Sequence, residues 1–188
     1  MVTGADRIEY CKDHLPYELM MLYFTHDSLQ GPLRVLEANA FIESFCVHAR
    51  NLLDFFHNAK YTDQSRLRLT AVHFVVTQSP FAKKKQLGKE IGLLYKKLHD
   101  QIFHMGQRSS RIEGKITPEE RQKLFDYIEK LWTAFYPEMN LALRAHIPLI
   151  QKSFSPTSQD TIPALPPAYA TTGHFTLTPN SMAAYYRD

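Results

Sequence analysis

The chain has 188 residues, of which 44% are hydrophobic and 22% charged, the balance of one globular domain of ordinary size. It has no apolar run of the roughly 18 residues that a membrane span needs, and its start contains Asp6 and Glu9, so we expect neither a transmembrane segment nor a signal peptide. The net charge of +3 is too small to indicate a polyanionic partner by itself.

Helical signals begin near residue 14. We predict a first helix over residues 14–29, with Asp13 as N-cap and Pro16 in the first turn, where proline is tolerated. A second helix, from Leu33 to about Asn58, contains neither Gly nor Pro. Its apolar residues recur with a period near 3.6, which is typical of one buried helical face.

The next segment, residues 61–79, is ambiguous. We favour a short helix followed by irregular chain, although Arg66 to Leu69 alternates as in a strand. Ser79 and Pro80 form an N-cap and first-turn pair, which predicts a third helix from about residue 80 to Met105, followed by a polar, basic loop.

The fourth helix has the clearest start of all. Thr117-Pro118-Glu119-Glu120 is a capping box with proline in the first turn, and a fifth helix is expected over residues 138–150. The fold class is therefore all-α, an up-down helical bundle of four to five helices spanning residues 1–152. Residues 153–188 are rich in Pro, Ser and Thr, which predicts a flexible, disordered C-terminal tail.

One stripe of the second helix is unusually polar. At about 100° per residue, six side chains fall within about 80° of one another: Asn39, Glu43, Cys46, Arg50, Asp54 and His57. Salt bridges at helical spacing, such as Arg50 with Asp54, are one explanation. A groove that binds or cleaves a ligand is the other, whereas His48 lies on the opposite, Phe-rich side.

The segment His48-Ala-Arg-Asn-Leu-Leu-Asp-Phe-Phe-His57 resembles the Arg, polar, several residues, His motif of the HEPN superfamily of helical nucleotide-binding and ribonuclease domains. The wider pattern from Asn39 to Phe56 is also similar to uncharacterised bacterial helical proteins. The resemblance implies that Arg50, Asn51 and His57 bind and polarise an RNA phosphate during metal-independent cleavage.

The spacing of that motif sets a geometric condition. Arg50 and His57 lie roughly 10.5 Å apart along an unbroken helix. One phosphate reaches both only if the arginine extends, if the helix opens near Asp54, or if a homodimer brings a second copy alongside.

Positive charge is concentrated in residues 83–115, where nine cations stand against three acids, a net charge of +6. A solvated helix face explains such a cluster, and attraction of RNA is the functional alternative. The candidate RNA-binding cations are Lys83, Lys84, Lys85, Arg108 and Arg111.

A second histidine pair lies in the third helix. His99 and His104 are five residues apart, which does not match the four-residue spacing of a zinc-binding HExxH helix. Asp100 does share a face with His104. It is placed to orient His104 as an acid or base, and the alternative is that His104 caps the helix end, where the dipole favours a protonated histidine. His104 thus joins Glu43 and Asp54 as a candidate binding residue. An inter-helical metal site built from Glu43, His48, His99 and His104 stays open, but no spacing demands it.

The two cysteines, Cys11 and Cys46, fit no disulfide framework or zinc pattern, so we expect reduced thiols, a cytoplasmic location and no cofactor. Two functions stay open. The first is a HEPN-like protein with RNA or a nucleotide as partner, acting as a metal-independent ribonuclease of a defence or stress system. The second is a non-enzymatic helical interaction protein.

Overall fold

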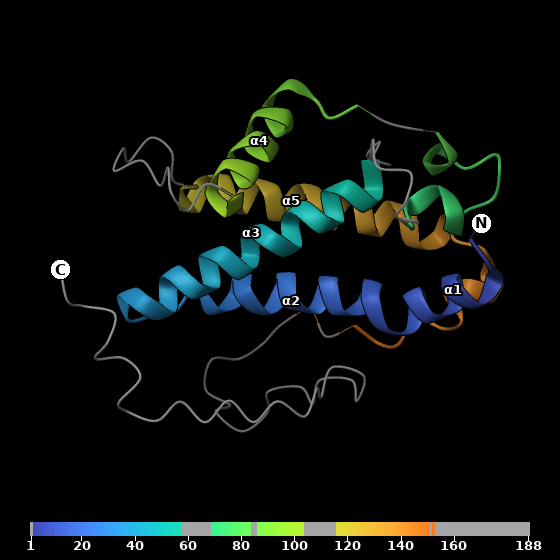
Figure 1. The fold of residues 1–188 in the computed structure, drawn as a ribbon, viewed down its shortest axis with the longest axis horizontal. Helices are drawn as coiled ribbons and strands as arrows, with labels where there is room; N and C mark the ends of the chain where they lie inside the picture. Colours follow the sequence, from blue (N-terminus) through green and yellow to red (C-terminus); the bar gives the residue numbers. More distant parts are fainter. Residues whose placement is uncertain (1, 58–68, 84–85, 104–115, 151, 153–188) are drawn as a thin grey trace. The chain divides into compact units, whose positions relative to one another are not determined.

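The computed structural model describes residues 2–57, 69–83, 86–103, 116–150 and 152, and for residues 101–103 the backbone alone. Four long helices alternate in direction along the chain (Figure 1): α2 (Leu15–Ser28), α3 (Val35–His57), α4 (Lys89–Phe103) and α5 (Pro118–Phe135). The prediction of an all-α, up-down bundle is confirmed. The predicted tail, residues 153–188, lies outside the described residues.

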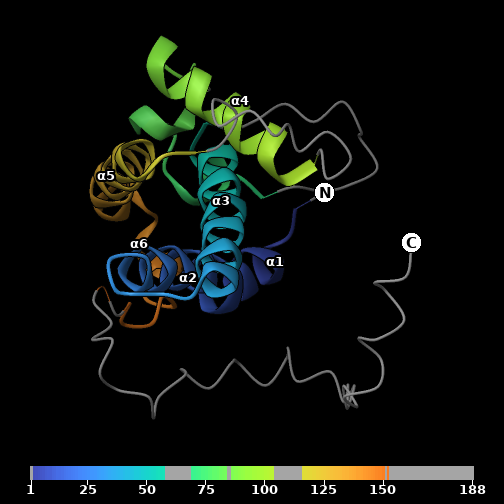
Figure 2. The ribbon, with the colours of Figure 1, turned by 90° about the vertical axis from the view of Figure 1, so that its left-hand side faces the viewer.

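Helix α3 lies at the centre of the bundle. It packs against α2, α4 and α5. In Figure 2, α2 and α5 lie on one side of α3, and α4 crosses near its upper end. The apolar period predicted for this helix places Phe45, Leu52 and Phe56 in the core, each at most 1% exposed. Phe56 meets Phe135 of α5 edge to face, with ring centroids 5.5 Å apart, so aromatic contacts join the central helix to its neighbour.

The N-terminal helix begins earlier than predicted. Thr3 caps α1 (Gly4–Glu9) through a capping box with Asp6, and the chain continues through a π-helical turn, η1 (Tyr10–His14), directly into α2. The expected N-cap at Asp13 is therefore wrong. Pro16 cannot donate a backbone hydrogen bond and would clash in a regular α-helix, and the wider π turn just before it accommodates the ring.

The predicted third helix begins nine residues later than expected. The side chain of Ser79 does cap, but it caps a short 3₁₀ turn, η3 (Pro80–Ala82), by accepting from the Phe81 backbone N–H at 3.2 Å. Phe81 is 2% exposed and fixes this turn to the core, so the long helix restarts only at Lys89. Another 3₁₀ turn, η2 (Ala71–Phe74), precedes it, and the expected short helix falls largely outside the described residues.

The capping box at Thr117 and Glu120 is confirmed, but the helix expected over residues 138–150 is wrong. After η6 (Tyr136–Glu138), Met139 forms an isolated β-bridge with Val75, and the Asn140 N–H donates to the Phe74 carbonyl at 2.8 Å. This extended pairing interrupts the helix and leaves only α6 (Leu141–Arg144), capped by Asn140. None of the described helices combines the length and the apolar character required to cross a membrane.

Candidate functional site

The polar stripe predicted on α3 is unevenly exposed, and Cys46 in its middle is fully buried. Glu43, near the start, is exposed and Arg50 is partly exposed. Asp54 and His57, at the end, are only 2% and 6% exposed because α4 and α5 cover that part of α3. The stripe is therefore not one open groove, and its candidate residues have different environments.

Arg50 and Asn51 belong to a hydrogen-bonded chain that starts on α2. The Glu18 carboxylate accepts from Asn51 Nδ2 at 3.1 Å, and its other oxygen lies 2.7 Å from Nδ1 of His48. The side-chain oxygen of Asn51 in turn accepts from an Nη of Arg50 at 3.1 Å. One carboxylate thus binds His48 and Asn51, three residues apart on one face of α3, and Asn51 in turn bonds the Arg50 guanidinium.

Glu18 was not selected from the sequence. It is the only carboxylate in the first three turns of an otherwise apolar helix, and that isolation is the signal that identifies it. His48 is 6% exposed and packs edge-on against Tyr17, with centroids 5.5 Å apart. His48, which the helical angles place on the Phe-rich side, is thus buried, and its partner is this carboxylate.

Asp54 joins α3 to α4. Its carboxylate accepts from the Tyr95 hydroxyl at 2.5 Å, and the Tyr95 ring contacts the imidazole of His99 one turn further along α4, with centroids 4.8 Å apart. A charge-assisted bond of this kind is stronger than a neutral one and holds both side chains in place. Asp54 therefore has a structural partner whether or not it also meets a ligand.

His57 lies in a different environment from Arg50. Its Nε2 is 3.0 Å from the Tyr127 hydroxyl of α5, and the two rings are nearly parallel, with an interplanar angle of 12°. At 6% exposure, the imidazole contacts a substrate only if it leaves this packing. The two ends of the HEPN-like motif are thus not presented together on this protomer.

Arg50 is instead electrostatically coupled to His99. Burial lowers the pKa of His99, the positive charge of Arg50 lowers it further, and the carboxylates of Asp54 and Asp100 act in the opposite direction. The sequence placed His99 only in an open metal alternative. The charge of Arg50 is one of the influences on the pKa of His99, and the ring of Tyr95, the partner of Asp54, contacts the His99 ring directly.

Most of the predicted RNA-binding cations lie outside the described residues. Lys83 is exposed, whereas Lys84, Lys85, His104, Arg108 and Arg111 fall outside the described residues. Within the residues that the structure covers, no group of three or more His, Cys, Asp or Glu side chains is arranged to hold a metal ion. His48, one member of the inter-helical metal alternative, is bound by Glu18.

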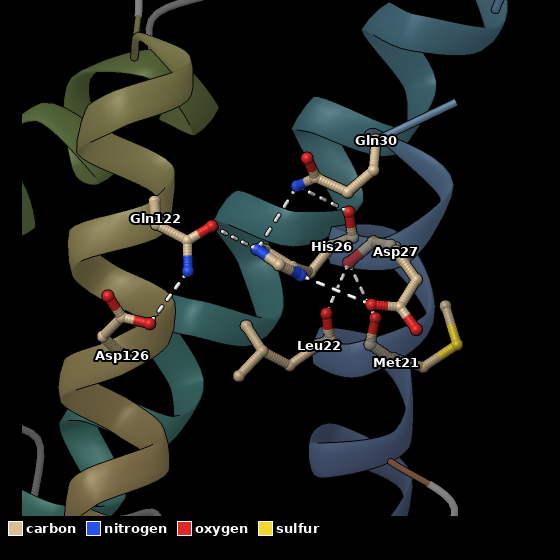
Figure 3. A network of polar contacts seen from close by, with 8 residues as sticks. Met21, Leu22, His26, Asp27, Gln30, Gln122 and Asp126 are labelled. Atoms are coloured by element: carbon tan, nitrogen blue, oxygen red, sulfur yellow. Dashed lines mark hydrogen bonds and ion pairs between the residues drawn. The ribbon is translucent and has the colours of Figure 1, made fainter. Parts of the chain in front are cut away.

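A second polar network, which the sequence did not indicate, joins α2 to α5 (Figure 3). The imidazole of His26 stacks on Phe125 at 3.8 Å between centroids, and its Nε2 lies 3.0 Å from the side-chain oxygen of Gln122. Gln122 also donates to Asp126 at 2.8 Å. This network fixes the α2–α5 contact and lies apart from the residues of the motif.

No family model, curated protein or solved structure matches the chain. The expectation of a HEPN-like relationship consequently depends on residues 48–57 and on the helical fold.

Proposed function

We propose that this chain is a HEPN-like helical protein that associates with RNA, and that Arg50 contacts a phosphate of the RNA backbone. The observation that supports the proposal is the series of hydrogen bonds that joins Glu18 to Asn51 and Asn51 to Arg50. It holds a partly exposed guanidinium in one direction, and arginine is the side chain best suited to bind phosphate through two parallel hydrogen bonds.

Preorganisation strengthens such a contact. A free arginine loses rotamer entropy when it binds, whereas a guanidinium already bonded to Asn51 loses less. The nearby carboxylate of Asp54 would repel phosphate, but its bond from Tyr95 places a donor against that charge. The excess of cations in residues 83–115 adds long-range attraction for a polyanion.

Cleavage by the Arg50 and His57 pair requires more than this protomer provides. His57 would have to give up its contact with Tyr127 before it reached a phosphodiester. We therefore propose phosphate binding at Arg50 as the primary role, with metal-independent cleavage and homodimer formation as additional steps to be measured.

The test compares two arginine variants of the full chain. Binding of fluorescein-labelled, mixed-sequence single-stranded RNA is followed by anisotropy for the wild type, Arg50→Gln and Arg34→Gln. Arg34 lies at the other end of α3, with an 85% exposed side chain paired to Glu37, and serves as the matched control. We expect about tenfold weaker binding for Arg50→Gln, as for loss of a charge-assisted contact, and little change for Arg34→Gln.

The same samples, incubated with and without EDTA, report on cleavage. Cleavage that resists EDTA and disappears in Arg50→Gln supports a ribonuclease, and binding without cleavage supports association alone. Equal binding by both variants contradicts a role for Arg50. Light scattering with and without RNA shows whether a homodimer forms.

A second candidate function is a non-enzymatic interaction protein. It is favoured by exposed apolar side chains, since Val35 and Leu36 at the start of α3 are 76% and 82% exposed and Leu93 of α4 is 64% exposed. Absence of RNA binding by the wild type would favour this candidate over the first.

A further inference from the structure

A hydrogen-bonded polar pair joins α3 to α4. Asp54 of α3 accepts from Tyr95 of α4. The two helices run in roughly opposite directions in Figure 1 and cross obliquely in Figure 2. One turn back from Asp54 is Arg50, and one turn on from Tyr95 is His99. Both steps span four residues, about 6 Å of helix, and lead to the same side of the Asp54–Tyr95 contact.

The electrostatics agree with that geometry. After burial, the charge of Arg50 is the largest influence that lowers the pKa of His99. The groups that act in the other direction are Asp54 on α3 and Asp100 on α4 itself. From α5, the carboxylate that contacts α4 is Glu120, and it binds Lys97.

We infer that Arg50 and His99 together form a single phosphate site between α3 and α4, in which His99 takes up a proton as the phosphate binds. For its ligand, RNA, this inference rests on the proposed function. Its new content is that the imidazole beside the bound phosphate belongs to α4 and not to the motif residue His57.

The chemistry of the pair explains the proton uptake. In the free site, burial and the Arg50 charge keep the His99 imidazole neutral at neutral pH. A phosphate on the guanidinium adds negative charge next to the ring and offsets the repulsion from Arg50. The imidazolium form then becomes favourable and donates a second, charge-assisted hydrogen bond to a phosphate oxygen.

The two candidate imidazoles, those of His99 and His57, differ in their exposure to solvent. Arg50 and His99 are both partly exposed, whereas His57 is 6% exposed and stacked on Tyr127. The ring of Tyr95 meets His99 at an interplanar angle of 71°, edge to face, and limits its rotation. A phosphate can therefore meet a held imidazole on this side of the Asp54–Tyr95 contact without rearrangement of the core.

The first measurement is the pH dependence of RNA binding. Phosphodiesters do not titrate between about pH 5.5 and about pH 7.5, so a change in affinity over that range reports on the protein. We expect up to about tenfold weaker binding at the higher pH, because one unit of change in a linked pKa corresponds to a factor of ten. His99→Gln should flatten this dependence, and His14→Gln, which alters an exposed histidine, should leave it unchanged.

The second measurement follows the imidazole itself by ¹⁵N NMR. The His99 signal is assigned by its absence in His99→Gln, and its titration is recorded with and without sulfate, a phosphate mimic that stays fully charged over this range. We expect sulfate to move the His99 midpoint to higher pH in the wild type and not in Arg50→Gln.

The outcomes separate the two proposals. If Arg50→Gln loses RNA binding while sulfate and RNA leave the His99 titration unchanged, the proposed function stands and the shared site is overturned. If sulfate moves the His99 midpoint but no RNA binds, the two residues form an anion site and RNA association fails. His99→Gln with the wild-type pH dependence also overturns the inference.

Discussion

The hydroxyl of Tyr127 on α5 lies 3.0 Å from Nε2 of His57 at the end of α3, and the two rings are stacked. This pairing divides the Arg50 to His57 motif. Its arginine is partly exposed and bonds Asn51, whereas its histidine takes part in the packing of α3 on α5. Residues that are close in one motif therefore have separate physical roles.

Tyr127→Phe tests the structural role of His57. The substitution removes the hydroxyl and leaves a buried ring nitrogen without this bond, which should lower the free energy of unfolding by about 1 kcal/mol. Urea unfolding measures the loss, and Tyr136→Phe, at a 39% exposed ring, is the control. RNA affinity should change little in either variant. Unchanged stability together with weaker RNA binding would show that His57 and Tyr127 contact the ligand.

Glu18 should affect both stability and binding. Glu18→Ala removes the acceptor for Asn51 and the partner of His48, and we expect unfolding to become easier by about 2 kcal/mol. RNA binding should weaken as well, because Arg50 loses its fixed direction. Glu18→Gln keeps an acceptor for Asn51 and should retain more of the RNA affinity than Glu18→Ala.

Exposed Glu9 provides the matched control for Glu18. Glu9→Ala should leave stability within about 0.5 kcal/mol of the wild type. If Glu18→Ala lowered the free energy of unfolding without any change in RNA affinity, the hydrogen bonds through Asn51 would have no part in positioning Arg50.

The sequence predicted those helices whose signals are local. The capping box at Thr117 and the long period of α3 depend on residues a few positions apart, and both predictions were correct. The helix expected over residues 138–150 is reduced to Leu141–Arg144, and at its start Met139 pairs with Val75, more than sixty residues away. Such a contact leaves no trace in local periodicity.

The sequence predicted which candidate side chains share one face of α3, but not how deeply each of them is buried. Helical angles correctly placed Arg50 and Asp54 on one stripe, but burial depends on which helices pack over it. Asp54 is buried because Tyr95 of α4 meets it, and the carboxylate that positions Asn51 comes from Glu18 on α2. Neither partner follows from the sequence of α3 alone.

The ion pair between Lys97 of α4 and Glu120 of α5 should make stability depend on acid pH. Burial raises the pKa of Glu120, but the bonds from Lys97 and from the Thr117 backbone outweigh it and bring the pKa below its ordinary value near 4.5. A carboxyl with a lowered pKa stabilises the fold above its ordinary value, and that contribution is lost as pH falls through the folded-state value.

Glu120→Gln isolates this charge, because glutamine preserves the capping box with Thr117. We expect a loss of about 1 kcal/mol near pH 7, since both side chains are partly exposed, and no difference from the wild type near pH 3. Urea unfolding at both pH values, in a double-mutant cycle with Lys97→Met, measures the coupling. A loss of equal size at both pH values would show that the charge does not stabilise the fold.

The two cysteines should be unreactive until the bundle opens. Burial raises the pKa of Cys46 to about 12 and that of Cys11 to about 11, and both side chains are fully covered. Thiolate is the reactive form, so Ellman's reagent near pH 8 should label neither thiol before denaturant unfolds the chain. Ala5→Cys, at an exposed position of α1, is the control and should react at once.

Because folding raises both pKa values, the thiols stabilise the fold fully below their ordinary value near 9, and stability should fall as pH rises above it. Rapid labelling of the native protein would mean that the packing over Cys11 in η1 and Cys46 in α3 opens readily, and burial would then not protect the two thiols.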